Sequence, residues 1–370
     1  MARYSREVLS DIPKTVHGGQ AWKLGSVEDF SHNLNPFGPP EDLKEIIEGA
    51  IGGIDHYPDD ACSELKGTIS RAFQVKDDNV VVGAGSSEII RNFPHAFMEP
   101  GDAALLNRPS FAEYGHQCRI AGVDIVTNDL LQTDDFKIDR DVISEKISSG
   151  IKALYICNPN NPTGRVEPRK KILDIVKECE DNNVMVFLDE TLLELVDGSG
   201  DISCVKYVND FDNLLIAGSL TKSFAIPGIR IGFGFANASM IEEMDKVRMT
   251  WNIGEIEQTV AKVLIGDRME HVHKAARMMG IESKRMHSGL IDAGMSVGNV
   301  ADSFFYFCSI GDLNMDAKGF KDLMLKKGIM IRDCSSFGSG FERYIRFSVK
   351  DGIRNDRFVD AVKGVIREIG

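Results

Sequence analysis

Seven short apolar runs, separated by helical or loop stretches, constrain the fold of this chain more than any other feature. Such runs indicate buried strands, and strands that alternate with helices are typical of a mainly parallel sheet covered by helices on both faces. The stretch 170–180 is the clearest intervening helix, because its apolar residues recur at helical spacing. The sequence therefore predicts a three-layer α/β/α domain with seven strands, near residues 80–82, 102–106, 124–127, 153–157, 184–188, 214–217 and 229–235.

The pattern changes at about residue 258. A long helical region is followed there by three strand-like runs, at 304–308, 329–331 and 344–349, which predict a smaller α+β domain. A chain of 370 residues with 43% hydrophobic content can bury a large core and form two closely joined domains. We expect an N-terminal arm with part of the small domain at 1–45, the large domain at 46–257 and the small C-terminal domain at 258–370.

Composition excludes several classes of function. The net charge of −13 argues against a nucleic-acid surface, and no apolar run reaches the roughly 18 residues of a membrane span. Seven scattered cysteines form no C-x-x-C pair, which favours neither a zinc site nor a disulfide framework and fits a reducing cytoplasm. His271 and His273 lie two residues apart on a predicted helix and so face different ways. We therefore expect no metal site.

The stretch from Ser219 to Arg230 combines an amine, hydroxyl groups and a guanidinium. Lys222 follows Ser219 and Thr221, and an apolar run at 214–217 places it at the end of a strand. A lysine amine forms a Schiff base with an aldehyde, while hydroxyls and an arginine suit a phosphate. Pyridoxal 5'-phosphate carries both groups. The alternative is a surface lysine that follows a strand.

Asp189 ends another apolar run, 184–188, and is followed by Glu190. A carboxylate at the end of a buried strand needs a cationic partner. A protonated pyridine nitrogen is one candidate, since it lets the ring act as an electron sink. The alternative is an aspartate that caps the next helix.

The loop 158–164 follows the apolar run at 153–157 and holds three Asn, two Pro and one Gly. Each Pro restricts the residue before it to extended geometry, so the loop is stiff and can hold an Asn amide as a rigid donor. Turn chemistry alone would explain much of the same composition.

A glycine turn follows the apolar run at 80–82. Gly85 and Ser86 precede a helical stretch, and the free N–H groups at a helix start bind phosphate. Glu88 replaces the third glycine of a dinucleotide fingerprint, which argues against that cofactor. The alternative is a serine that only caps the helix.

In this order, the glycine turn, asparagine loop, aspartate and lysine resemble the fold-type I pyridoxal-phosphate enzymes, specifically the class I/II aminotransferase superfamily. The resemblance covers nearly the whole chain. It implies a large pyridoxal-phosphate domain with a mainly parallel seven-stranded sheet, a small C-terminal domain and a homodimer with shared active sites. Phrases similar to the threonine-phosphate decarboxylase branch lie at 17–19, 33–40, 109–114, 220–228 and 332–337.

The resemblance also implies a role for each residue. Lys222 would carry the cofactor and move protons, Asp189 would pair with the ring nitrogen, Asn161 would donate to the ring hydroxyl and Phe111 would stack on the ring. Tyr57 would reach the cofactor phosphate of the neighbouring subunit. Arg346 would take the substrate carboxylate. The cofactor phosphate would lie among Gly85, Ser86, Ser219, Thr221 and Arg230, and further substrate contacts would come from His17, Asn33 and Arg332.

One position departs from the pattern. Many aminotransferases carry a tyrosine three residues after the aspartate, and Leu192 stands there in this chain. The missing phenol weakens ordinary transamination without excluding it. Through the phrases named above, the resemblance implies decarboxylation of L-threonine O-3-phosphate to aminopropanol phosphate, in cobalamin biosynthesis, with histidinol-phosphate or a related amino-acid aminotransferase as the alternative.

Overall fold

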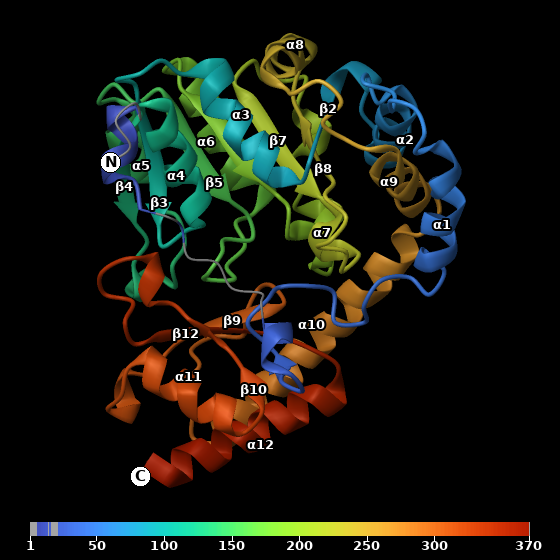
Figure 1. The fold of residues 1–370 in the computed structure, drawn as a ribbon. Helices are drawn as coiled ribbons and strands as arrows, with labels where there is room; N and C mark the ends of the chain where they lie inside the picture. Colours follow the sequence, from blue (N-terminus) through green and yellow to red (C-terminus); the bar gives the residue numbers. More distant parts are fainter. Residues whose placement is uncertain (1–5, 14, 16–20, 370) are drawn as a thin grey trace.

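The computed structural model describes residues 6–13, 15 and 21–369. Its largest sheet has seven strands in the order β2-β8-β7-β6-β5-β3-β4 (Figure 1). All are parallel except β8, which runs antiparallel to both of its neighbours. The predicted seven-stranded, mainly parallel sheet is confirmed. The strands are β2 (Val80–Gly83), β3 (Ala103–Arg108), β4 (Asp124–Asp129), β5 (Ala153–Cys157), β6 (Met185–Asp189), β7 (Leu214–Ser219) and β8 (Gly232–Phe235).

Helices cover both faces of this sheet because the side chains that the strands present to each face are apolar. Tyr155 and Phe187 belong to one core with α3 (Ser86–Phe97), α4 (Ala112–Ala121) and α8 (Ala238–Val247). Leu154, Ile156 and Leu188 belong to the core on the other face, with α2 (Ser63–Phe73), α5 (Arg140–Ile147), α6 (Arg169–Asp181) and α9 (Glu255–Asp267). A further helix, α1 (Leu43–Ala50), packs against α9. The result is the predicted three-layer arrangement.

A smaller domain lies beside the carboxyl ends of the parallel strands (Figure 1). It has a three-stranded antiparallel sheet in the order β11-β12-β9 and a two-stranded sheet in which β1 pairs with β10. Phe30, from the N-terminal part of the chain, lies in its apolar core together with Phe320, Phe347 and Phe358. Its elements are β1 (Glu28–Asp29), β9 (Phe305–Ser309), β10 (Ile329–Met330), β11 (Arg332–Asp333), β12 (Tyr344–Ser348), α11 (Ala317–Lys326) and α12 (Gly352–Ile369).

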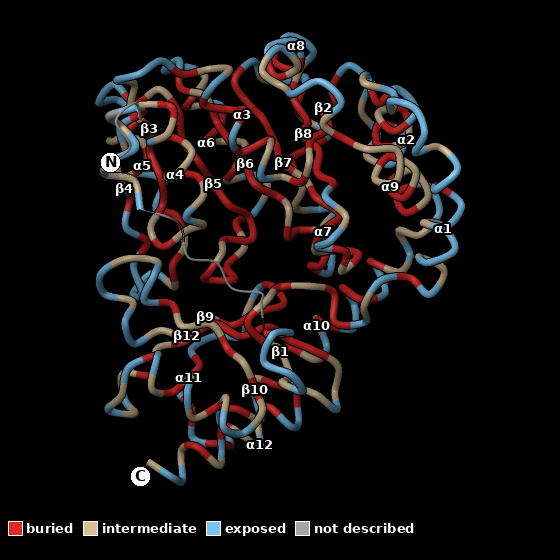
Figure 2. The backbone as a smooth tube through the Cα atoms, in the orientation of Figure 1, coloured by how far each residue is buried: buried red, intermediate tan, exposed pale blue. Residues whose placement is uncertain are grey.

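The long helix α10 (Met269–Asp292) connects the two domains. Its first half contributes Val272 and Met279 to a core of the large domain, and its second half contributes Met286 and Leu290 to the core of the small one. The borders at 45/46 and 257/258 stay a prediction. Figure 2 shows that buried segments run through the strands of the large domain and through the small domain.

No helix in the described part of the chain is both long enough and apolar enough to cross a membrane.

Candidate active site

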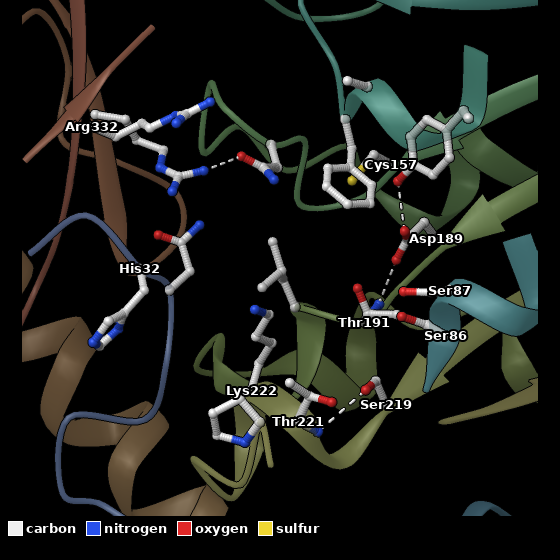
Figure 3. A pocket seen from close by; sticks show the side chains of 18 of the residues that line it. His32, Ser86, Ser87, Cys157, Asp189, Thr191, Ser219, Thr221, Lys222 and Arg332 are labelled. Atoms are coloured by element: carbon white, nitrogen blue, oxygen red, sulfur yellow. Dashed lines mark hydrogen bonds between the residues drawn. The ribbon is translucent and has the colours of Figure 1, made fainter. Parts of the chain in front are cut away.

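A cavity of about 330 Å³ lies at the carboxyl ends of the strands, between the two domains (Figure 3). In parallel α/β sheets this is the edge at which ligands bind. Most residues predicted for the site line it, although they lie far apart in the chain. These lining residues are Asn33, Ser86, Phe111, Asn161, Asp189, Ser219, Thr221, Lys222, Arg230, Arg332 and Arg346.

Lys222 lies on the short helix α7 (Leu220–Ser223), directly after β7. The hydroxyl of Ser219 caps this helix by accepting from the Thr221 N–H at 3.2 Å. Burial lowers the pKa of the half-buried Lys222 to about 8, and the positive charges of Arg346 and Arg230 act in the same direction. Near neutral pH a larger fraction of this lysine is therefore the free amine that attacks an aldehyde.

Asp189 ends β6 and is 4% exposed. Its two carboxylate oxygens accept from the Thr191 N–H at 2.9 Å and from the Tyr114 hydroxyl at 2.5 Å. Burial raises its pKa. Among the described residues, no lysine or arginine forms an ion pair with it. A buried carboxylate held by neutral donors at the wall of a cavity suits a cationic group of a ligand, such as a protonated ring nitrogen.

Tyr114 was not assigned a role from the sequence. It is 1% exposed on α4, and burial raises its pKa well above the usual value for tyrosine. Its spacing from Phe111 could have indicated it, because residues three apart on a helix lie on the same side. The two rings contact each other edge to face, with centroids 5.6 Å apart. Thr191 and Ser87, which also line the cavity, were likewise not predicted.

The turn between β2 and α3 has the geometry of a phosphate cradle. Gly85 adopts a φ of +79°, and a Cβ there would collide with the guanidinium of Arg230. A Cβ on Gly232 of β8 would collide with the backbone of Ser86. The first N–H groups of α3 therefore stay accessible beside Arg230, and a helix start next to a guanidinium is well suited to an anion.

Arg332 and Arg346 are direct partners in the register of β11 and β12. Arg346 is 7% exposed; it donates to the Ser31 carbonyl at 2.6 Å and to the side-chain oxygen of Asn161, while its Nε is buried without a partner. Burial lowers its pKa to about 10, and the charge of Arg332 acts in the same direction. Arg332 donates to the Ser336 hydroxyl at 2.8 Å. Two guanidinium groups thus face one cavity.

The segment before α1 closes another side of the cavity. Asn33 is 4% exposed, and its side-chain oxygen is buried without a hydrogen-bond partner. Asn35 fastens this segment to the lysine turn, because its N–H donates to the Lys222 carbonyl and its side chain to the Ser223 carbonyl, both at 2.9 Å. His32 also lines the cavity, although the sequence gave no reason to expect it; burial lowers its pKa to about 4, which keeps it neutral.

His17 lies outside the described residues. Tyr57 does not line this cavity: it is 75% exposed and stacks on Trp251 with ring centroids 4.4 Å apart, so its role toward a second subunit stays a prediction. Leu192, at the position of the missing tyrosine, lines the cavity.

In the described part of the chain, no group of three or more His, Cys, Asp or Glu side chains is placed to hold a metal ion.

Comparison with known proteins agrees with this geometry. The family profile "Aminotransferase class I and II" matches residues 26–362. A histidinol-phosphate aminotransferase of Caldicellulosiruptor saccharolyticus is 28% identical over 370 residues, 98% of this chain and 99% of that protein. A protein named as a threonine-phosphate decarboxylase, from Caldanaerobacter subterraneus subsp. tengcongensis, is 30% identical over 353 residues, 95% and 94% of the two chains.

The fold is also similar to that of a solved structure. The crystal structure of histidinol-phosphate aminotransferase from Sinorhizobium meliloti, in complex with pyridoxal-5'-phosphate, superposes with a TM-score of 0.87 at 19% identity, over 100% of this chain and 99% of that one. The matched family depends on pyridoxal phosphate. The lysine, the buried aspartate and the phosphate cradle fit that cofactor. With pyridoxal 5'-phosphate as its cofactor, this chain belongs to the class I and II aminotransferase family.

Proposed function

We propose that this protein is a pyridoxal-phosphate enzyme for a small amino acid that carries a phosphate, and that it decarboxylates L-threonine O-3-phosphate to aminopropanol phosphate. The observation that carries the proposal is the cross-strand pair of Arg332 and Arg346. Like charges directly opposite each other destabilise a sheet. Two anionic groups on the substrate would neutralise both arginines, in addition to the cofactor phosphate held beside Gly85 and Arg230.

The chemistry of the two candidate substrates separates them. Threonine phosphate carries a carboxylate and a phosphate on one molecule, which matches two adjacent guanidinium groups. Histidinol phosphate carries a phosphate and no carboxylate. An aminotransferase would still use both arginines if its second substrate were a dicarboxylate. The relative from Caldicellulosiruptor saccharolyticus, which aligns over nearly its whole length, is named as a histidinol-phosphate aminotransferase. Histidinol-phosphate or related amino transfer is therefore the second candidate.

Each residue of the site would have its own role in the reaction. When bound, the cofactor supplies an electron sink for the bond that is broken. Asp189 would hold the ring nitrogen protonated, and the donors from Tyr114 and Thr191 would keep its carboxylate in place. Arg346 would grip the substrate carboxylate and Arg332 the substrate phosphate. After loss of carbon dioxide, a proton must replace the carboxylate at Cα, and the Lys222 amine would deliver it.

Two further parts of the proposal concern assembly and location. Tyr57 stacks on Trp251, and both are exposed. Ile51, Ile54 and Met249, close to them in sequence, are also at least 48% exposed. Apolar patches of this kind mark interaction sites. We propose a second copy of the chain as the partner, which would bring each Tyr57 toward the other cofactor phosphate. A cytoplasmic location belongs to the same proposal.

The deciding experiment is incubation of the purified holoenzyme with L-threonine O-3-phosphate, with carbon dioxide and keto acid measured in parallel. Histidinol phosphate with 2-oxoglutarate is the second assay. We expect carbon dioxide from the first and little conversion in the second. Robust amino transfer from histidinol phosphate, with no carbon dioxide from threonine phosphate, would replace the first candidate by the second.

The phosphate contact is tested separately by Arg332→Ala. Loss of a charge-assisted contact costs about 2–5 kcal/mol in transition-state binding, on the order of 30- to several-thousand-fold in kcat/KM. Turnover of threonine phosphate should fall by that factor, while slow turnover of unphosphorylated threonine stays almost unchanged. The matched control is Arg343→Ala, an exposed arginine next to β12. An equal loss with both substrates would refute the assignment of Arg332 to the phosphate.

A further inference from the structure

A second cavity lies on the opposite face of the sheet from Asp189. It has a volume of about 630 Å³, within the range of about 300–1,000 Å³ that is typical of small-molecule sites. We call it the rear cavity; it lies between the end of α2, the junction of α9 with α10 and the loop 190–206. Its walls are mainly apolar, with Phe73, Leu193, Ile216, Phe233 and Met269 among them.

Two carboxyl groups face this cavity, and they differ in their partners. Glu190 is 6% exposed and fully hydrogen-bonded: its oxygens accept from the Ser203 hydroxyl at 2.6 Å and the Cys204 N–H at 2.8 Å. Glu194 is half-buried, and one of its oxygens is buried without a hydrogen-bond partner. Among the described residues no ion pair reaches it. Burial raises its pKa to about 7, with the Ser223 hydroxyl as the only group that opposes this.

Among the described residues that line the rear cavity, the basic side chains are Arg71 and Lys206. Both are exposed, so water and salt screen their charges. The carboxyl group of Glu194 is less exposed and is screened less. A charge in such a place is costly unless it is paired. The interior of the cavity therefore favours a cation over an anion.

We propose that the rear cavity binds a small molecule with an apolar body and one ammonium group, whose N–H donates to Glu194. Phe73, Phe233 and Met269 would cover the apolar body, and the ammonium would complete a charge-assisted hydrogen bond in a partly dehydrated place. The site is separate from the cofactor cavity, since none of its lining residues lines that cavity. The proposal does not depend on which reaction the enzyme catalyses.

The probe is N,N-dimethyl-2-phenylethylamine, measured by calorimetric titration of the holoenzyme at pH 8. As a tertiary amine it cannot condense with the cofactor aldehyde, and Glu194 is largely ionised at that pH. A fragment of this size binds with a Kd on the order of 1 mM. The neutral comparison is 2-phenylethanol, which should bind roughly tenfold more weakly or worse, because it lacks the charge.

Three variants test whether the probe binds in the rear cavity. Glu194→Gln should reduce the affinity for the amine to that for the alcohol, and Ala72→Phe should block the rim of the cavity from the exposed face of α2. Asp197→Asn, a change in an exposed carboxylate that does not line the rear cavity, should leave the affinity unchanged. Equal binding of amine and alcohol, unchanged affinity in both Glu194→Gln and Ala72→Phe, or no saturable binding of the amine would each overturn the proposal. So would a loss of affinity in Asp189→Asn with none in Glu194→Gln, because the probe would then lie in the cofactor cavity.

Discussion

Replacement of Lys222 by methionine should make the cofactor-free protein more stable at pH 7. The fold withdraws this lysine from water and places it near Arg346 and Arg230, which lowers its pKa from 10.5 to about 8. One pKa unit corresponds to 1.36 kcal/mol, so the folded state holds the charged amine at a cost of at most about 3 kcal/mol. Lys222→Met removes the charge and keeps a side chain of similar length. Sites built for chemistry commonly carry such a cost.

The pH dependence of this effect has a definite sign. Below pH 8 the amine is charged in both the folded and the unfolded protein, and the whole cost is present. Between pH 8 and 10.5 the folded state has lost the proton while the unfolded state still holds it, so the wild-type protein gains stability as the pH rises. The advantage of Lys222→Met should therefore be about 3 kcal/mol at pH 7 and should vanish as the pH approaches 10.5.

Urea unfolding of the cofactor-free proteins at pH 7 and at pH values between 8 and 10.5 measures both the size and the slope of this effect. The matched control is Lys363→Met, a change of an exposed lysine on α12, which should alter the free energy of unfolding by less than about 0.5 kcal/mol. A Lys222→Met protein that is no more stable than the wild type at pH 7 would refute the reasoning. So would a gain that does not change with pH.

Three further outcomes follow from the site. Asp189→Asn should reduce turnover far more than cofactor affinity, measured by steady-state kinetics and cofactor titration; an unchanged rate would reduce the carboxylate to a helix cap. Tyr114→Phe removes a donor to a buried carboxylate and should lower the free energy of unfolding by about 1.5–3 kcal/mol in urea, against a loss near zero if the hydroxyl is not needed. In sedimentation at micromolar concentration the chain should be a dimer, and a fully active monomer would contradict the shared site at Tyr57.

The sheet, and the position of most predicted residues at the cavity, could be predicted because each depends on local sequence. An apolar run marks a strand wherever it pairs, and the polar residues just after it lie at the carboxyl edge by the geometry of a parallel sheet. Asp189 and Lys222 are examples: each ends or follows a run of its own, and the two runs become the neighbouring strands β6 and β7.

Contacts between distant parts of the chain could not be predicted in this way. Tyr114 and Asp189 are 75 residues apart, and only the packing of α4 on the sheet joins the hydroxyl to the carboxylate. The register that places Arg332 opposite Arg346 depends on the pairing of two short strands, which neither strand specifies alone. The neutral His32 depends on burial and on the charge of Lys350, far along the chain.

The side chains that line the cofactor cavity carry an excess of positive charge. Its lining carries four strongly basic side chains, Lys222, Arg230, Arg332 and Arg346, against one carboxylate, Asp189. Burial lowers the pKa values of Lys222 and Arg346, and the positive charges of neighbouring arginines act in the same direction. A cofactor phosphate offsets part of that excess, and the anionic groups of a substrate would offset more of it. A substrate that bears both a carboxylate and a phosphate balances the cavity, so its binding should stabilise the holoenzyme more than binding of either anion alone. We therefore expect a doubly anionic substrate to bind more tightly than a singly anionic one, whichever bond the enzyme then breaks.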